Sequence, residues 1–199
     1  MNWSQQAFYE TLNDASRAER ATTLFTLMVD RGASNYDEDV TQLAHALQAA
    51  TLASESNAGF ELITAALFHD LGHLLLGEDN GTTRVLAEDL DHEHIGASFL
   101  NNFFPLAVTD PIRLHVPAKR YLCSTETEYW EQLSEASKRS LEVQGGLFSE
   151  TELAALRQEP FLRQALDLRR WDDQAKVTDL EVPAIEAYRS AVETSFLTD

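Results

Sequence analysis

The stretch LFHDLGH, residues 67–73, decides how the rest of the chain is interpreted. Apolar residues precede it at helical spacing from residue 60 onward, so His69 and Asp70 are predicted to close a mostly buried helix. We expect Gly72 to mark the end of that helix. A buried carboxylate without a partner costs free energy, so this position favours a paired or metal-bound role for Asp70.

The histidines of the chain all lie between residues 45 and 115, which places the candidate chemistry in the middle of the sequence. His94 is two residues from His92, points elsewhere on a helix, and is not predicted to join a site. Imidazole and carboxylate ligands suit iron, manganese or zinc, and the lack of thiolates argues against a cysteine-based zinc site. With Asp70 as a bridge, the pattern predicts a site for two metal ions. Its predicted ligands are His45, His69, Asp70, His92, His115 and Asp172.

The sequence predicts an all-α fold. Apolar residues recur at helical spacing in three segments, residues 39–53, 60–68 and 92–103. A capping-box pattern at Ser149 and Glu152 predicts a further helix start. No stretch alternates between apolar and polar residues in the way that a half-buried strand would. Four prolines are expected to open helices: Pro111, Pro117, Pro160 and Pro183.

Length and charge restrict the classes of function. At 199 residues with a net charge of −18, the chain is predicted to form a single domain over residues 1–199. Such an acidic surface repels phosphate backbones and anionic lipid, so we expect no nucleic-acid or membrane partner. No apolar run is long enough to span a bilayer. The single cysteine, Cys123, fits a reducing compartment and predicts a cytoplasmic protein.

Four local segments carry a resemblance to a known family. They are QLAHALQ (residues 42–48), LHVPAKRYLC (114–123), LEVQGG (141–146) and RRWDDQAK (169–176). Together with the His-Asp pair, they resemble the HD-domain di-iron oxygenases, and specifically their phosphonate-cleaving branch. The resemblance runs from about Tyr36 to Lys176 and implies a single HD-domain helical bundle with its core at about residues 36–176. It also implies two iron ions in a mixed-valent Fe(II)/Fe(III) state, with dioxygen as co-substrate.

The resemblance further assigns roles to individual residues. It implies that one iron is held by His45, His69, Asp70 and Asp172, and the other by His92 and His115 with Asp70 as the bridge. It implies that the phosphonate is bound by His73, Lys119 and Arg169, with His73 and Lys119 acting in catalysis. Ser137 is expected to join the phosphonate-binding residues, although the neighbouring Ser140 is an alternative for that place.

The spacing of the cations agrees with this assignment. Lys119 lies one helical turn after His115, so its ammonium group can lean over a metal bound there. Arg169 lies three residues before Asp172 on the same helix face, and a guanidinium group suits forked contacts with phosphonate oxygens. An anionic substrate needs such a local concentration of positive charge in a protein with only 15 lysines and arginines.

The segment before the first ligand helix is expected to bind the cationic end of the substrate. Tyr36 could hold a quaternary ammonium group on its aromatic face, and either Glu38 or Asp39 could supply a carboxylate. An acidic helix start is the alternative explanation for these two acids. The resemblance, taken with this segment, implies cleavage of an (R)-1-hydroxy-2-(trimethylammonio)ethylphosphonate to phosphate and glycine betaine, or of the primary amine to glycine.

Two other classes of function remain open from the residues alone. An HD-domain phosphohydrolase would use its two metals to activate water against a nucleotide or small phosphate ester. A scaffold without catalysis would lack ligands, yet here the ligand set is complete. His45 favours the oxygenase, because a fourth imidazole completes a set of six ligands for two ions.

Overall fold

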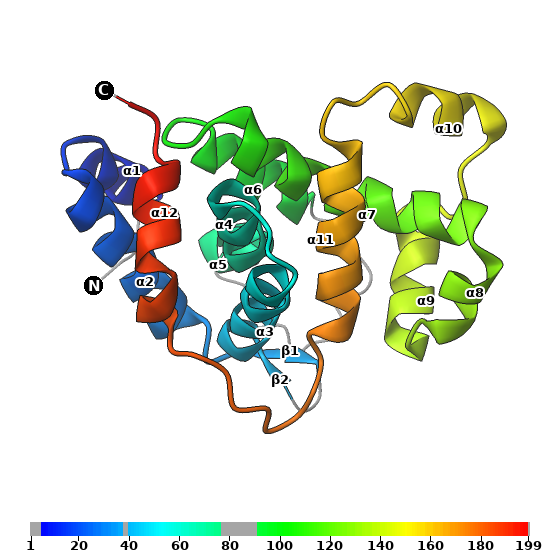
Figure 1. Cartoon of the computed structure of the whole chain (residues 1–199), viewed down its shortest axis with the longest axis horizontal. Coiled ribbons are helices and arrows are strands. Elements are labelled where there is room, and N and C mark those ends of the chain that lie inside the picture. The colour runs from blue at the N-terminus through cyan, green and yellow to red at the C-terminus, as the bar shows by residue number, and fades with distance from the viewer. Residues whose placement is uncertain (1–4, 38–39, 77–90, 199) are drawn as a thin grey trace.

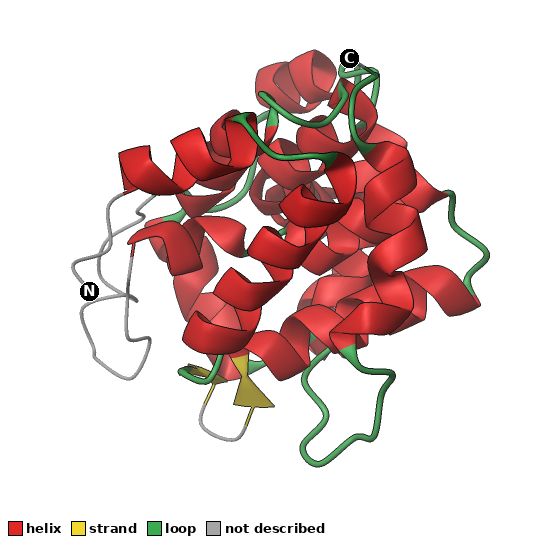
Figure 2. Cartoon of the chain, turned by 90° about the vertical axis from the view of Figure 1, so that its left-hand side faces the viewer, coloured by secondary structure: helices red, strands yellow, loops and turns green. Residues whose placement is uncertain are grey.

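The helical periodicity of the sequence is realised through most of the chain. The computed structural model describes residues 5–37, 40–76 and 91–198, and the ribbon in these ranges is almost entirely helical (Figures 1 and 2). Its helices are α1 (Gln5–Asn13), α2 (Arg17–Arg31), α3 (Gln42–Glu55), α4 (Phe60–Phe68), α5 (Leu71–Leu76), α6 (His92–Leu100), α7 (Leu106–Thr125), α8 (Thr127–Gln132), α9 (Glu135–Val143), α10 (Glu150–Leu156), α11 (Leu162–Gln174), the 3-10 turn η1 (Ile185–Tyr188) and α12 (Arg189–Ser195). The predicted all-α class is confirmed.

One short strand pair was not predicted. Strands β1 (Asn35–Asp37) and β2 (Val40–Thr41) run antiparallel immediately before α3. The pair is too short to show alternation in the sequence. It ends at Thr41, whose side chain accepts a hydrogen bond from the backbone N–H of Ala44 and so caps α3. This cap fixes where the helix that carries His45 begins.

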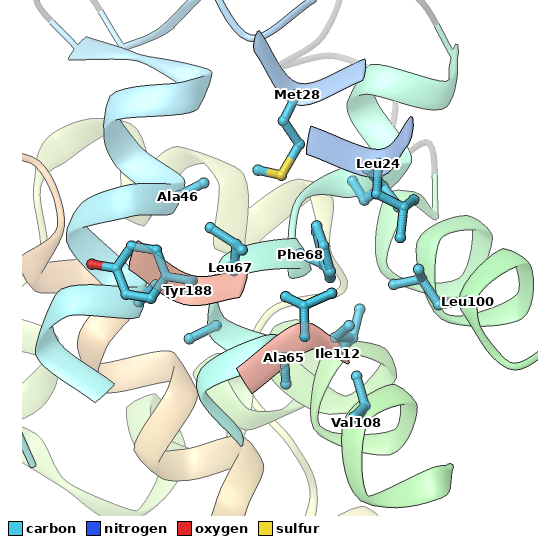
Figure 3. Packing of buried hydrophobic residues seen from close by; sticks show 14 of the residues in the cluster. Leu24, Met28, Ala46, Ala65, Leu67, Phe68, Leu100, Val108, Ile112 and Tyr188 are labelled. Atoms are coloured by element: carbon cyan, nitrogen blue, oxygen red, sulfur yellow. The ribbon is translucent and has the colours of Figure 1, made fainter. Parts of the chain in front are cut away.

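Helix α4 forms the centre of the bundle. It is apolar on nearly every side because α3, α7, α11 and α12 all pack around it. Figure 3 shows Leu67 and Phe68 from α4 among residues of α2, α3, α6 and α7. Leu24 of α2 and Tyr188 of η1 join the same buried cluster, so its packing extends on both sides of residues 36–176. The end of α4 therefore lies deep in the molecule, and His69 follows it directly.

The expectation that Pro111 and Pro117 open separate helices is wrong. Both lie inside α7, which continues through them to Thr125. An interior proline removes a helical hydrogen bond and is normally destabilising. Here α7 packs along α4, α6 and α11, and burial of its apolar face offsets that loss. The continuous helix holds His115 and Lys119 in a fixed relation, one turn apart.

The remaining helix starts follow the sequence more closely. The capping box of Ser149 and Glu152 is present at the start of α10. Pro160 and Pro183 each precede a helical segment by two residues, rather than standing at its first position. Within the described ranges, no helix combines the length and the apolar character needed to cross a membrane.

The sequence predicts that Gly72 ends a helix, but the structure places it inside one. It lies within α5, where a Cβ atom would stand 2.0 Å from the carbonyl oxygen of His92. Gly96 of α6 faces it, and a Cβ there would lie 3.0 Å from the backbone nitrogen of Gly72. The two glycines therefore let the backbones of α5 and α6 touch, which brings His92 toward Asp70.

We expect Gly72→Ala to destabilise the fold by about 1–3 kcal/mol, because the new methyl group overlaps backbone that has no room to move. Chemical denaturation measures the loss. The control is Gly59→Ala at the start of α4, where a Cβ would meet nothing closer than the flexible end of Glu61 at 3.4 Å. That control creates no overlap and loses only the preference of an N-cap for glycine over alanine, which is expected to cost about 0.5–1 kcal/mol. Equal effects in the two variants would contradict the close approach of α5 and α6.

Candidate metal and anion site

The first group of predicted ligands meets where α3, α4 and α11 converge. Nε2 of His45 lies 3.1 Å from Nε2 of His69 and 3.3 Å from Oδ1 of Asp172. Nε2 of His69 lies 3.3 Å from Oδ2 of Asp70. All of these residues are buried. Four ligand atoms from distant parts of the sequence thus face one small volume.

The second group lies on the other side of Asp70. Nε2 of His92, from α6, lies 3.2 Å from Nε2 of His115 in α7. The two nitrogens are 3.4 Å and 3.7 Å from Oδ1 of Asp70. The two carboxylate oxygens of Asp70 therefore face different groups, Oδ2 the first and Oδ1 the second. This is the arrangement that a carboxylate bridging two metal ions requires.

Hydrogen bonds on the far side of the rings test whether this donor set fits a metal. The Nδ1 atoms of His45, His69 and His115 lie 2.8, 2.9 and 2.7 Å from the carbonyl oxygens of Ala175, Ala66 and Ile112. A carbonyl oxygen only accepts, so each Nδ1 must donate a proton, which leaves the Nε2 lone pair of a neutral ring facing inward. Converging lone pairs need a cation between them. The residues fit metal ions.

The protonation of the site without metal supports the same conclusion. Burial disfavours a charged His69, but the adjacent Asp70 carboxylate outweighs burial and raises the pKa of His69 to about 9. Burial also opposes the charge on Asp70, yet His69 and His92 hold its pKa well below the usual value. A proton thus occupies the position that a metal would take, and metal binding must displace it.

The two imidazoles of the second group, His92 and His115, are kept neutral. Burial, followed by the neighbouring imidazoles, lowers the pKa of His115 well below the usual value. Burial and His73 lower the pKa of His92. Neutral imidazole is the form that binds a metal, so both residues are suited to act as ligands.

The two histidines outside the predicted ligand set differ in position. His73 stacks on His92 with ring centroids 4.0 Å apart, and one of its ring nitrogens lies near a ring nitrogen of His92 and a carboxylate oxygen of Asp70, in a group that could hold a metal. It therefore borders the site, next to the second ligand group. His94 is exposed on α6 and lies with Asp91 and Glu93 rather than with the predicted ligands.

Lys119 lies beside the ligand groups and is almost fully buried. Its Nζ donates to Oγ of Ser140 and, at 3.2 Å, to Oε1 of Gln144, both near the end of α9. Burial, followed by the positive charge of Arg169, lowers the pKa of Lys119 to about 7. Both hydrogen-bond partners of Lys119 among the described residues are neutral, so this buried lysine is placed to receive an anion.

Arg169 connects the first ligand group to this cationic region. Its Nη1 lies 2.7 Å from Oδ2 of Asp172, whose other oxygen faces His45. Its Nε and Nη2 donate to Asp173. Arg169 is buried, and the two carboxylates raise the pKa of its guanidinium against the effect of burial, so it stays charged.

A third cation, Lys176, was not singled out as a site residue. Its Nζ donates to Oγ of Ser137 at 3.2 Å and lies 3.6 Å from Oδ1 of Asp173. The two serines left open by the sequence thus contact different lysines, Ser137 with Lys176 and Ser140 with Lys119. The position of Lys176 one turn after Asp172 was the signal that could have identified it.

Three predicted substrate residues cannot be placed. Glu38 and Asp39 lie outside the described residues, and of Tyr36 only the backbone, within β1, is described.

Cys123 is a packed thiol. It is buried in a cluster with Leu122 and Leu141, and burial raises its pKa.

Comparisons with known proteins identify the family to which the chain belongs. A family model described as "HD domain" matches residues 43–173. The chain is 56% identical over 176 residues to hydroxymethylphosphonate dioxygenase of Gimesia maris, which covers 88% of both chains. It is 43% identical over 154 residues to 1-hydroxy-2-(trimethylamino)ethylphosphonate dioxygenase (glycine-betaine-forming) of Leisingera caerulea, which covers 77% of this chain and 78% of the relative. The chain is therefore an oxidoreductase that belongs to the HD-domain family, in the oxygenase branch that holds these two phosphonate dioxygenases.

Proposed function

We propose that the chain is a di-iron oxygenase that cleaves the carbon–phosphorus bond of a 1-hydroxyalkylphosphonate. The observation that carries the proposal is the position of Asp70, whose two oxygens face separate groups of inward-pointing imidazoles. Buried cations lie directly beside these groups, where the anionic end of a substrate would sit. A carbon–phosphorus bond offers no good leaving group for hydrolysis, so oxidation at C1 is the reasonable route.

The residues have distinct tasks in this proposal. His45, His69 and Asp172 would hold one iron, His92 and His115 the other, and Asp70 both. Iron in this setting supplies the redox chemistry with dioxygen. Lys119, Arg169 and His73 would bind the phosphonate and fix C1 of the substrate against the ligand groups, with Ser137 supporting them. Their charge would neutralise the phosphonate and the phosphate that forms from it.

We place hydroxymethylphosphonate first among the candidate substrates, because the relative with 56% identity is named for this compound. Its cleavage balances with one dioxygen: the C–P bond breaks, carbon is oxidised to formate, and phosphorus leaves as phosphate. The trimethylammonio substrate predicted from Tyr36 and Asp39 is the second candidate, and the relative with 43% identity is named for it. Both candidates present the same 1-hydroxyphosphonate end to Lys119 and Arg169.

The oxygenase assignment is tested by metal analysis and oxygen consumption. The purified protein is expected to contain close to two irons and to consume dioxygen when hydroxymethylphosphonate is added, with release of phosphate. The phosphohydrolase alternative predicts a different result, namely hydrolysis of a phosphate ester without oxygen and with zinc or magnesium bound. That result would overturn the proposal.

A competition between substrates separates the two candidates. We expect one preparation to turn over hydroxymethylphosphonate faster than either (R)-1-hydroxy-2-aminoethylphosphonate or its trimethylammonio analogue. If the trimethylammonio compound is preferred, and if Tyr36→Ala and Asp39→Ala abolish that preference, the residues before α3 bind a cationic group as the sequence predicts. Such an outcome would change the substrate and leave the oxygenase chemistry in place.

A further inference from the structure

The guanidinium group of Arg169 is held in one plane by two neighbouring carboxylates. Asp172 accepts from Nη1 at 2.7 Å, and Asp173 accepts from Nε at 3.0 Å and from Nη2. These contacts use three of the five N–H groups of the side chain. With respect to the described residues, one N–H group remains on each Nη atom, so the orientation of the fork decides where an anion can be bound.

Asp173 is in turn held by a residue from another helix. The hydroxyl of Tyr129, in α8, donates to Oδ2 of Asp173, the same oxygen that accepts from Nε of Arg169. Tyr129 is 7% exposed and packs with Leu122 and Leu141. Burial raises the pKa of Tyr129, so its hydroxyl stays protonated at neutral pH and donates to Asp173.

We propose that Tyr129 and Asp173 are positioning residues, which keep the free N–H groups of Arg169 directed at the phosphonate. The inference rests on the proposed function, because it takes Arg169 as a phosphonate-binding residue. The order of contacts is Tyr129 to Asp173 to Arg169, and the same guanidinium also touches Asp172. Tyr129 thus acts on substrate binding through two intermediate side chains.

The charge of Asp173 makes the proposal easy to distinguish from a simple electrostatic effect. A carboxylate beside an anion site weakens anion binding by repulsion, so Asp173→Asn would strengthen binding if Asp173 acted only through its charge. If Asp173 positions Arg169, the same change weakens binding, because an amide N–H then faces the guanidinium donors. The two explanations predict opposite signs.

The experiment uses the iron-loaded enzyme with hydroxymethylphosphonate and follows dioxygen consumption. Tyr129→Phe is expected to raise KM about three- to tenfold, with kcat and iron content close to wild type, because one hydrogen bond to the carboxylate is lost. Asp173→Asn is expected to raise KM further. Inorganic phosphate serves as a second probe, since its inhibition constant reports anion binding without turnover and should rise in parallel.

Tyr121→Phe is the matched control. The hydroxyl of Tyr121 also contacts an arginine, accepting from Nε of Arg157 at 3.4 Å, but this arginine is exposed whereas Arg169 is buried. We expect no change in KM or in phosphate inhibition for this variant. If Tyr129→Phe resembles it while Arg169→Ala raises KM, the positioning role is wrong and the anion site stands. If Arg169→Ala leaves both values unchanged, the anion site itself is wrong, and the positioning role falls with it.

Discussion

If Asp70 bridges two irons as proposed, Asp70→Asn is expected to remove both of them and with them all oxygenase activity. The side chain keeps its shape, but an amide has one oxygen and an N–H₂ group that cannot bind a cation. Because the two oxygens of Asp70 face different groups of imidazoles, this substitution damages both groups at once. Iron analysis after dialysis measures the loss, which is expected to be nearly complete.

Single-group variants provide the comparison for Asp70→Asn. His45→Ala and Asp172→Ala each remove a ligand atom from the first group only, and His115→Ala removes one from the second only. Each is therefore expected to lower iron content by less than Asp70→Asn does. If Asp70→Asn retains as much iron as His115→Ala, Asp70 does not bridge the ions.

The sequence was sufficient to predict which imidazole and carboxylate groups converge, but not their surroundings. His45, His69, His92 and His115 could be identified because imidazoles at helical positions are rare enough to stand out, and they do converge in the structure. What orients them is mostly backbone: the carbonyl groups of Ala66, Ala175 and Ile112 accept from their rings. Any residue type carries such a carbonyl, so the sequence holds no signal for it.

The expectations for α5 and α7 failed for a related reason. Local rules treat Gly72 and Pro117 as helix breakers, whereas the structure keeps both inside helices. Gly72 is needed because α6 comes into contact with it, and that contact depends on tertiary packing. The same limit applies to Asp173, which local sequence presents as one more acid beside Asp172. Its role depends on Tyr129, 44 positions earlier in the chain.

Lys119→Ala is the second substitution expected to have a large effect. It removes the ammonium group that contacts Ser140 and Gln144 beside the ligand groups, and none of the proposed metal ligands. We expect KM for the phosphonate to rise about ten- to a hundredfold, as for the loss of a charge-assisted hydrogen bond, while iron content stays at the wild-type level. An unchanged KM would remove Lys119 from the anion site.

The charge of Lys119 should also shape the pH dependence of the enzyme. Burial and Arg169 lower its pKa to about 7, so the cationic form predominates only below that pH, and bound iron would lower the pKa further. Since the charged form binds the anion, kcat/KM is expected to fall as the pH rises through 7 or somewhat below. In the complex, the phosphonate raises the pKa of Lys119 again, so kcat should hold to higher pH. Lys119→Arg keeps its charge across this range and should lose this limb of the kcat/KM profile, even if its maximal rate is lower. A wild-type fall that persists unchanged in Lys119→Arg would assign the limb to another group.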